Sequence, residues 1–177
     1  MKTRELILTG LFGSFIAFGA IITVPLPLTP VPVTLQVFFI CLVSALLGAR
    51  IALYSVSIYL VLGFIGLPVF AGGKSGIGIL FGPTGGYLYG FLFAGFIMGL
   101  LIERKKNAGY VFSFLSMLIG IAIIYMFGSV HLMLVAKLDV FSALISGVIP
   151  FILPDIIKAI IATYLSIYLK SFDIIKI

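Results

Sequence analysis

Apolar residues fill most of the chain in long runs, and short polar, glycine-rich or proline-rich segments separate them. The runs cover residues 6–24, 35–48, 51–67, 84–102, 109–135 and 141–169. A transmembrane helix needs about 20 apolar residues. The pattern therefore predicts an all-α membrane protein with six transmembrane helices. The second and third runs are short and meet at Gly48-Ala49-Arg50, where we expect a tight helical hairpin.

Two connections differ from ordinary loops. Pro25–Pro32 holds four prolines in eight residues and cannot continue a helix. Gly66–Tyr87 is apolar, yet it is too rich in glycine and proline for a long helix. Irregular backbone at membrane depth is tolerated only where protein or a water-filled cavity covers it. We therefore expect a re-entrant or capping loop between the third and fourth helices, whereas the charged segment Glu103–Asn107 is an aqueous turn.

The composition agrees with a membrane protein. The 177 residues are 63% hydrophobic and only 9% charged, with a mean hydropathy of +1.38, whereas soluble domains carry about 25% charged residues. Six spans leave no room for a soluble domain, so we expect one membrane domain over residues 1–177. The run after Lys2 and Arg4 is longer than the apolar core of a signal peptide, and we interpret it as the first span.

The basic residues predict the orientation of the spans. With the N-terminus in the cytoplasm and an even number of spans, eight of the basic residues lie on the cytoplasmic side: Lys2, Arg4, Arg50, Arg104, Lys105, Lys106, Lys170 and Lys176. Only Lys74 and Lys137 lie outside, and this asymmetry follows the positive-inside rule. We expect a multi-pass protein of the cell membrane with both termini in the cytoplasm. The net charge of +6 then reflects topology and attraction to anionic membrane lipid, and it does not imply nucleic-acid binding.

Two opposite charges interrupt the last apolar run. Asp155 and Lys158 are three residues apart and share one face of a helix. Each charge costs roughly 2.5–3.5 kcal/mol at the centre of a membrane span. They can offset each other or together hold a polar solute. Asp155 lies 14 residues after residue 141, or ~21 Å along a helix. We therefore expect the pair at the floor of a pocket that opens to the outside.

Three segments of the chain resemble a known family. PLPLTPVPVTLQ, GLPVFAGGKSGIGILFGPTGGYLYGF and PDIIK are similar, in order and spacing, to the signature segments of the BioY family. Its members are the biotin-specific substrate-binding components, or S components, of energy-coupling factor (ECF) transporters. The resemblance implies high-affinity biotin binding and uptake across the cell membrane. It also implies a transmembrane coupling subunit and two cytoplasmic ATPases as partners.

The resemblance assigns roles to the two charges, and the chemistry of other side chains suggests further contacts. Asp155 and Lys158 match the aspartate and lysine implicated in holding the ureido head of biotin. Lys74 could meet the carboxylate of the valerate tail or simply face solvent. Gln36 can donate and accept hydrogen bonds but could also only begin a helix. The aromatic residues Phe70 and Tyr87 could flank the thioether ring, although packing explains any single aromatic residue equally well.

Small residues line one side of the first span. Gly10 and Ser14, and likewise Gly13 and Ala17, lie four residues apart, which lets another helix approach closely. The resemblance makes these four residues the contact for the coupling subunit. Tight packing within the bundle explains the same pattern, and the sequence leaves homo-oligomer formation open.

Two other function classes are less consistent with the sequence. An intramembrane enzyme or a metal site is disfavoured because His131 and Cys41 are the only residues of their types and no carboxylates are paired. We expect no catalytic residue, no metal and no cofactor, with biotin as the transported ligand. The alternative is a stand-alone ion-coupled carrier in which Asp155 binds a proton. Such carriers favour inverted repeats, but residues 90–177 hold no counterpart of the 66–86 loop.

Overall fold

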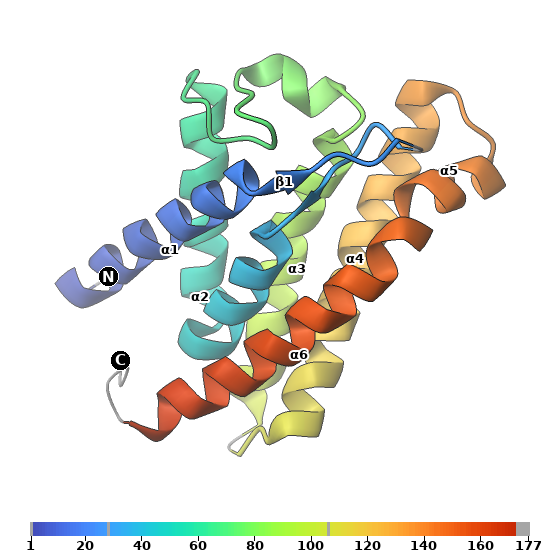
Figure 1. Cartoon of the computed structure of the whole chain (residues 1–177). Helices are drawn as coiled ribbons and strands as arrows, with labels where there is room; N and C mark the ends of the chain where they lie inside the picture. The colour runs from blue at the N-terminus through green and yellow to red at the C-terminus, as the bar shows by residue number, and fades with distance from the viewer. Residues whose placement is uncertain (1, 28, 106, 173–177) are drawn as a thin grey trace.

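The computed structural model describes residues 2–27, 29–105 and 107–172. This part of the chain is mostly helical (Figure 1). Its elements are α1 (Thr3–Ile21), β1 (Thr23–Val24), β2 (Val33–Thr34), α2 (Gln36–Phe64), the 3-10 helix η1 (Ile77–Phe81), α3 (Gly85–Arg104), α4 (Tyr110–Ala136), α5 (Val140–Gly147) and α6 (Ile149–Ser171). Within the described residues, α1, α2, α3, α4 and α6 are long and apolar enough to cross a membrane.

Helix α2 contains the turn that the sequence predicts between its second and third apolar runs. Gly48 has a φ of 80° and a ψ of −174°, so the helix breaks there into two arms that run in different directions (Figure 1). The carboxylate of Glu103, at the end of α3, accepts a hydrogen bond of 3.1 Å from the Ala49 amide. A side chain at position 48 would collide with this carboxylate. Glycine therefore supplies both the left-handed backbone and the space for the cap.

The expected single helix over residues 141–169 is wrong, because α5 and α6 are separate. The Asp139 carboxylate caps α5 by accepting hydrogen bonds from the Phe141 and Ser142 amides, at 3.0 and 3.1 Å. Hydrogen bonds from Ser142, and to a smaller extent from Phe141, lower the pKa of the Asp139 carboxyl. Val148 leaves the helical conformation, and Pro150 at the start of α6 has no amide hydrogen with which to continue α5. Asp155 is thus only six residues from the start of α6, about 9 Å instead of ~21 Å.

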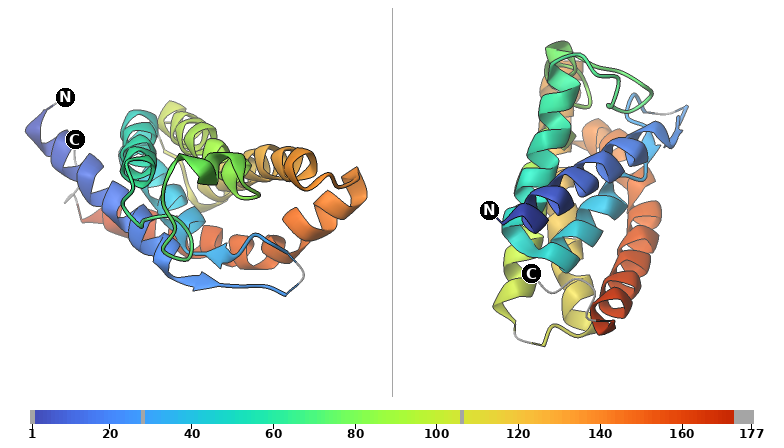
Figure 2. Two further views of the ribbon diagram at one scale, coloured as in Figure 1. Left: turned by 90° about the horizontal axis from the view of Figure 1, so that it is seen from above. Right: turned by 90° about the vertical axis from the view of Figure 1, so that its left-hand side faces the viewer.

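The proline segment is bounded by a short hairpin that the sequence analysis did not predict. Strands β1 and β2 pair antiparallel, with Thr23 opposite Thr34 and Val24 opposite Val33. The Leu35 amide donates to the Gly19 carbonyl at 2.9 Å, which holds the open end of the hairpin against α1. Seen from above, the hairpin and the chain between α2 and α3 both lie over the same end of the helices (Figure 2).

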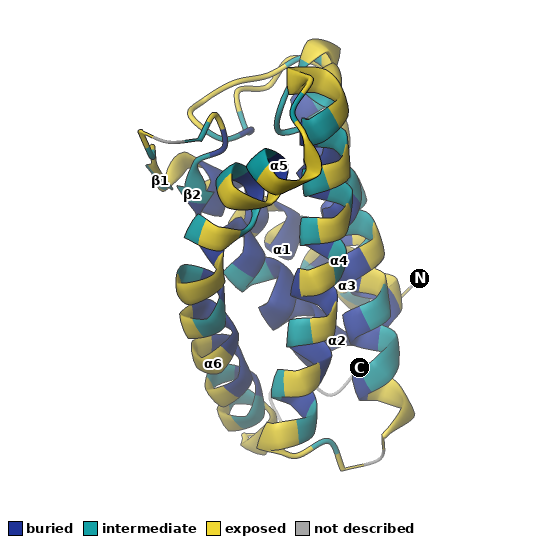
Figure 3. Ribbon diagram, turned by 90° about the vertical axis from the view of Figure 1, so that its right-hand side faces the viewer, coloured by how far each residue is buried: buried dark blue, intermediate teal, exposed yellow. Residues whose placement is uncertain are grey.

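The helices bury their inner faces and leave large apolar side chains outside. Helix α3 packs against α2 and α4, α6 packs against the same two helices, and α1 packs on α2. Ile16, Ile40 and Met98 are fully buried, whereas Ile65 and Val111 on the outer surface are more than two-thirds exposed, at 71% and 74%. Buried and exposed positions alternate around the helices accordingly (Figure 3). An apolar outer surface of this kind suits contact with lipid chains.

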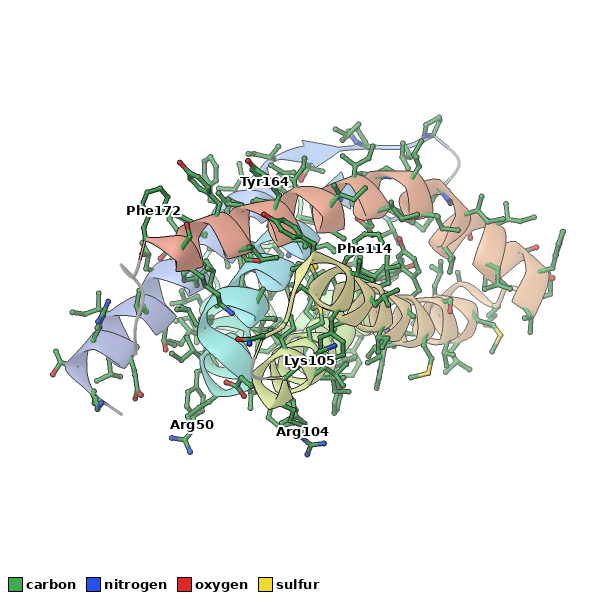
Figure 4. All side chains as sticks on the ribbon, turned by 90° about the horizontal axis from the view of Figure 1, so that it is seen from below. Arg50, Arg104, Lys105, Phe114, Tyr164 and Phe172 are labelled. Atoms are coloured by element: carbon green, nitrogen blue, oxygen red, sulfur yellow. The ribbon has the colours of Figure 1, made fainter. Side chains whose placement is uncertain are left out.

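Basic side chains gather at the end of the molecule opposite the hairpin. Seen from below, Arg50 and Arg104 project from the ends of helices, and Lys105 lies in the connection after α3 (Figure 4). Lys105 Nζ lies 4.3 Å from the centre of the Phe112 ring. Two further residues of the predicted cytoplasmic set, Lys106 and Lys176, lie outside the described residues.

Candidate functional site

A cavity of about 80 Å³ lies beneath the hairpin and the 66–84 segment. Its walls come from the end of the proline segment, from the 66–84 segment, and from α2, α3, α4 and α6. Six predicted ligand contacts line it: Gln36, Phe70, Lys74, Tyr87, Asp155 and Lys158. These six residues, which lie up to 122 positions apart in the sequence, thus share one small space.

The charged pair is buried in this cavity and is not turned toward lipid. Asp155 and Lys158 are 3% and 8% exposed, and Lys158 Nζ lies 2.7 Å from Asp155 Oδ1. The predicted pairing on one helix face is therefore confirmed. The hydroxyl of Tyr125, on α4, donates to the other carboxylate oxygen at 2.8 Å. Both oxygens of Asp155 thus have a partner that neutralises or solvates the charge inside the bundle.

Gln36, the first residue of α2, belongs to a second buried polar group. Thr34 Oγ1 donates to Gln36 Oε1 at 2.9 Å, and Gln36 Nε2 donates to the Tyr59 hydroxyl at 2.6 Å. A glutamine amide has two N–H groups, so one of them is left for a ligand. Gln36 is only 3% exposed, and its amide is held in the wall by its neighbours.

Phe70 and Tyr87 supply apolar surface to the cavity. The Phe70 ring is 1% exposed and lies 5.6 Å, centre to centre, from both Tyr59 and Phe64. The Tyr87 hydroxyl donates to the Gly147 carbonyl at 2.7 Å, so its polar end is satisfied by α5. The Tyr87 ring faces Phe151 at 6.3 Å. Both residues therefore present ring carbons, which suits an apolar part of a ligand.

Tyr87→Phe tests the link between α3 and α5. The substitution leaves the buried Gly147 carbonyl without its donor, which costs about 1 kcal/mol in the free energy of unfolding. Tyr89→Phe is the matched control, because the Tyr89 hydroxyl makes no hydrogen bond within the described chain. We expect Tyr87→Phe to melt at a lower temperature than Tyr89→Phe in detergent. Equal melting temperatures would mean that the Tyr87–Gly147 bond contributes nothing to stability.

Lys74 differs from the other five residues because it is exposed at the rim of the cavity. Its backbone carbonyl accepts a hydrogen bond of 2.9 Å from the Phe70 amide. Its ammonium forms no hydrogen bond or ion pair within the described residues, and it is available to an anionic group at the mouth of the cavity.

The four small residues of α1 do not share one environment. Gly13 and Ala17 are buried, and a Cβ at position 13 would lie 3.2 Å from the Ser55 carbonyl oxygen on α2. Gly10 has open space beside it, and Ser14 is exposed, with its hydroxyl donating to the Gly10 carbonyl at 3.0 Å. Gly13 and Ala17 thus pack within the protein, whereas Gly10 and Ser14 stay available for a partner.

Sequence reasoning missed two tyrosines of the site. Tyr125 bonds Asp155 from 30 residues away, and Tyr59 bonds Gln36 from 23 residues away. Each is a hydroxyl inside an otherwise apolar span, and a hydroxyl in such a place needs a partner. That signal marks both residues as members of a polar network but does not identify the partners.

Several known proteins are similar to this chain in sequence or in fold. The "Biotin transporter BioY" of Thermotoga maritima is 43% identical over 148 residues, which cover 84% of this chain and 85% of that protein. The "Biotin transporter BioY" of Rhizobium etli is 40% identical over 156 residues, covering 84% and 83%. A crystal structure of the S-component for biotin from an ECF-type ABC transporter superposes with a TM-score of 0.89 at 29% identity, covering 96% of this chain and 92% of the other.

The model of the BioY family matches residues 1–173, which is almost the whole chain. This match and the identity to the two transporters extend the local resemblance of the three signature segments to the complete helical core. The chain therefore belongs to the BioY family.

Proposed function

We propose that the protein binds biotin with high affinity in the Asp155–Lys158 cavity and takes it up as the S component of an ECF transporter. The observation that carries the proposal is the buried ion pair at a cavity wall. A ureido ring has two N–H donors and one carbonyl acceptor. A carboxylate can accept hydrogen bonds from the two N–H groups, and an ammonium can donate one to the carbonyl. The Asp155–Lys158 pair therefore complements the hydrogen-bonding groups of a ureido ring.

The remaining contacts follow the shape of the ligand. Phe70 and Tyr87 supply apolar surface for the thioether ring, and the free N–H of Gln36 offers one further hydrogen bond. Lys74 at the rim is placed to meet the carboxylate of the valerate tail. No catalytic residue, metal or cofactor enters this scheme, and the relatives are named as transporters.

The charge distribution supports a membrane orientation in which the cavity opens to the outside. Arg50, Arg104 and Lys105 lie at the end away from the hairpin and the 66–84 segment (Figure 4). Under the positive-inside rule this end faces the cytoplasm. Both termini are then cytoplasmic, the two arms of α2 act as separate spans, and the 66–84 segment caps the cavity at the outer surface.

Binding by the purified chain tests the proposal directly. Equilibrium dialysis with labelled biotin should give saturable 1:1 binding with a Kd below about 1 µM, which corresponds to roughly 8 kcal/mol. Uptake should then require co-expressed ATPase and coupling subunits. Lack of biotin binding would refute the proposed ligand, and full uptake without the ATPases would identify the chain as a stand-alone ion-coupled carrier.

The coupling subunit should contact the outer face of α1 at Gly10 and Ser14. Ser14→Leu places a bulky side chain on this exposed face, so we expect biotin uptake to fall about tenfold or more, with binding within about twofold of wild type. Ala122→Leu on α4 is the matched control, because Ala122 is likewise a small, exposed residue inside a long helix. Normal uptake by Ser14→Leu would place the partner surface elsewhere.

A further inference from the structure

The segment between α2 and α3 returns to the end of α2 and is anchored there at Gly63. The Gly63 carbonyl accepts hydrogen bonds from the Gly76 amide at 2.8 Å and from the Gly66 amide at 3.3 Å. Carbonyls in the last turn of a helix lack partners within the helix. Gly63 thus uses its carbonyl to hold the beginning and the middle of the segment that forms the roof of the cavity.

The Phe70 ring lies directly on Gly63. A Cβ at position 63 would fall within the space of the Phe70 ring, closer than carbon atoms can approach. Tyr59 and Phe64 flank the same ring, which is only 1% exposed. The absence of a side chain at Gly63 is therefore what admits the ring.

The backbone of Phe70 also forms hydrogen bonds within the turn that carries Lys74. The Phe70 amide donates to the Lys74 carbonyl and the Gly73 amide donates to the Phe70 carbonyl, both at 2.9 Å. Within the described residues, few side chains from other parts of the chain bond to the roof. Gly72 donates to Thr23 Oγ1 at 3.3 Å, and the His131 Nε2 contacts the Gly82 carbonyl at 3.1 Å. The buried ring is the main apolar attachment of this turn to the helices.

The cavity is too small to admit a ligand without movement of a wall. Its volume of about 80 Å³ lies below the ≈ 300–1,000 Å³ that is typical of small-molecule pockets. The helices on its sides pack against one another, whereas the roof is a glycine-rich connection whose apolar packing on the core comes from Phe70 and from the partly buried Val69, Ile79 and Leu80. The roof is accordingly the wall that can move at least cost.

We propose that Phe70 is a latch: seated on Gly63, it holds the roof closed and sets how long a ligand stays in the cavity. Besides lining the cavity, Phe70 is thus a positioning residue that acts through the 70–74 turn. The identity of the retained ligand rests on the proposed function, but the mechanical role of the ring does not.

Gly63→Ala tests the latch without changing any residue that lines the cavity. The added methyl group occupies the seat of the ring, so we expect biotin to dissociate about tenfold faster or more. Trypsin should also cleave faster after Lys74, because a released ring frees the 70–74 turn. Gly95→Ala on α3 is the matched control, since its Cβ would meet its nearest neighbour at an ordinary 3.5 Å.

A double-mutant comparison isolates the ring as the cause. In a Phe70→Ala background the seat is empty, so adding Gly63→Ala should change neither the dissociation rate nor the cleavage rate further. Phe70→Ala alone should open the roof, which covers the case in which Gly63→Ala does not fold.

The biotin dissociation rate and the rate of cleavage after Lys74 test the proposed ligand and the proposed latch independently. If the wild-type protein does not bind biotin, the proposed function fails, and the rate of cleavage after Lys74 still decides the latch. Wild-type cleavage rates in folded Gly63→Ala, or in Phe70→Ala if the former does not fold, would overturn the proposal.

Discussion

Asp155→Ala is expected to weaken biotin binding by at least ~2 kcal/mol, or roughly 30-fold. The substitution removes the acceptor for the ligand and also leaves Lys158 and Tyr125 without the oxygens that they now contact at 2.7 and 2.8 Å. A buried ammonium without its partner is costly, so the empty site itself becomes unfavourable. Equilibrium dialysis with labelled biotin measures the loss.

Asp155→Asn is the informative companion variant. It keeps a carbonyl oxygen that can accept from Tyr125 or from the ligand, but it removes the charge that pairs with Lys158. We expect intermediate affinity, with a melting temperature closer to wild type than that of Asp155→Ala. An affinity of Asp155→Ala within twofold of wild type would remove Asp155 from the binding site.

Gly48→Ala is expected to lower the free energy of unfolding by about 2–4 kcal/mol, the largest stability effect that we predict for a single methyl group. A positive φ with a ψ near 180° is a backbone region that is essentially confined to glycine, and it costs an L-residue about 1–3 kcal/mol. The new Cβ also displaces the Glu103 carboxylate from the Ala49 amide, and a lost cap costs about 1 kcal/mol more. Thermal unfolding in detergent measures the sum.

Gly10→Ala is the control for this substitution. Gly10 is helical and has open space around its Cα. Replacing glycine by alanine inside a helix gains up to about 1 kcal/mol. The two Gly→Ala variants should therefore shift the melting temperature in opposite directions. If they shifted it equally, the turn at Gly48 would not depend on glycine.

Local patterns in the sequence were sufficient for much of the fold. The apolar runs predicted α1, α3 and α4 to within a few residues. A membrane span must satisfy its backbone hydrogen bonds within its own helix, so its position can be recognised from a continuous run of apolar residues. The wrong prediction of a single helix over residues 141–169 also arises from a local feature of the sequence. Pro150 signals a break, but apolar residues continue on both sides of it, so the hydropathy pattern shows a single run.

Long-range partners were beyond such reasoning. Glu103 looks like a residue of an aqueous turn, yet it caps Ala49, 54 positions earlier in the chain. Gly10 and Gly13 have the same small-residue signature, yet only Gly13 is buried against α2. Nothing in a one-dimensional pattern states which face of a helix meets which neighbour.

The sequence by itself determined the membrane class, the number of apolar runs and the pairing of Asp155 with Lys158, because each depends on neighbours within one span. Only the tertiary structure decided that this pair lies in a cavity beside Tyr125, under a roof seated on Gly63. Those contacts join helices that are distant in the chain, and their geometry is set by how the helices pack.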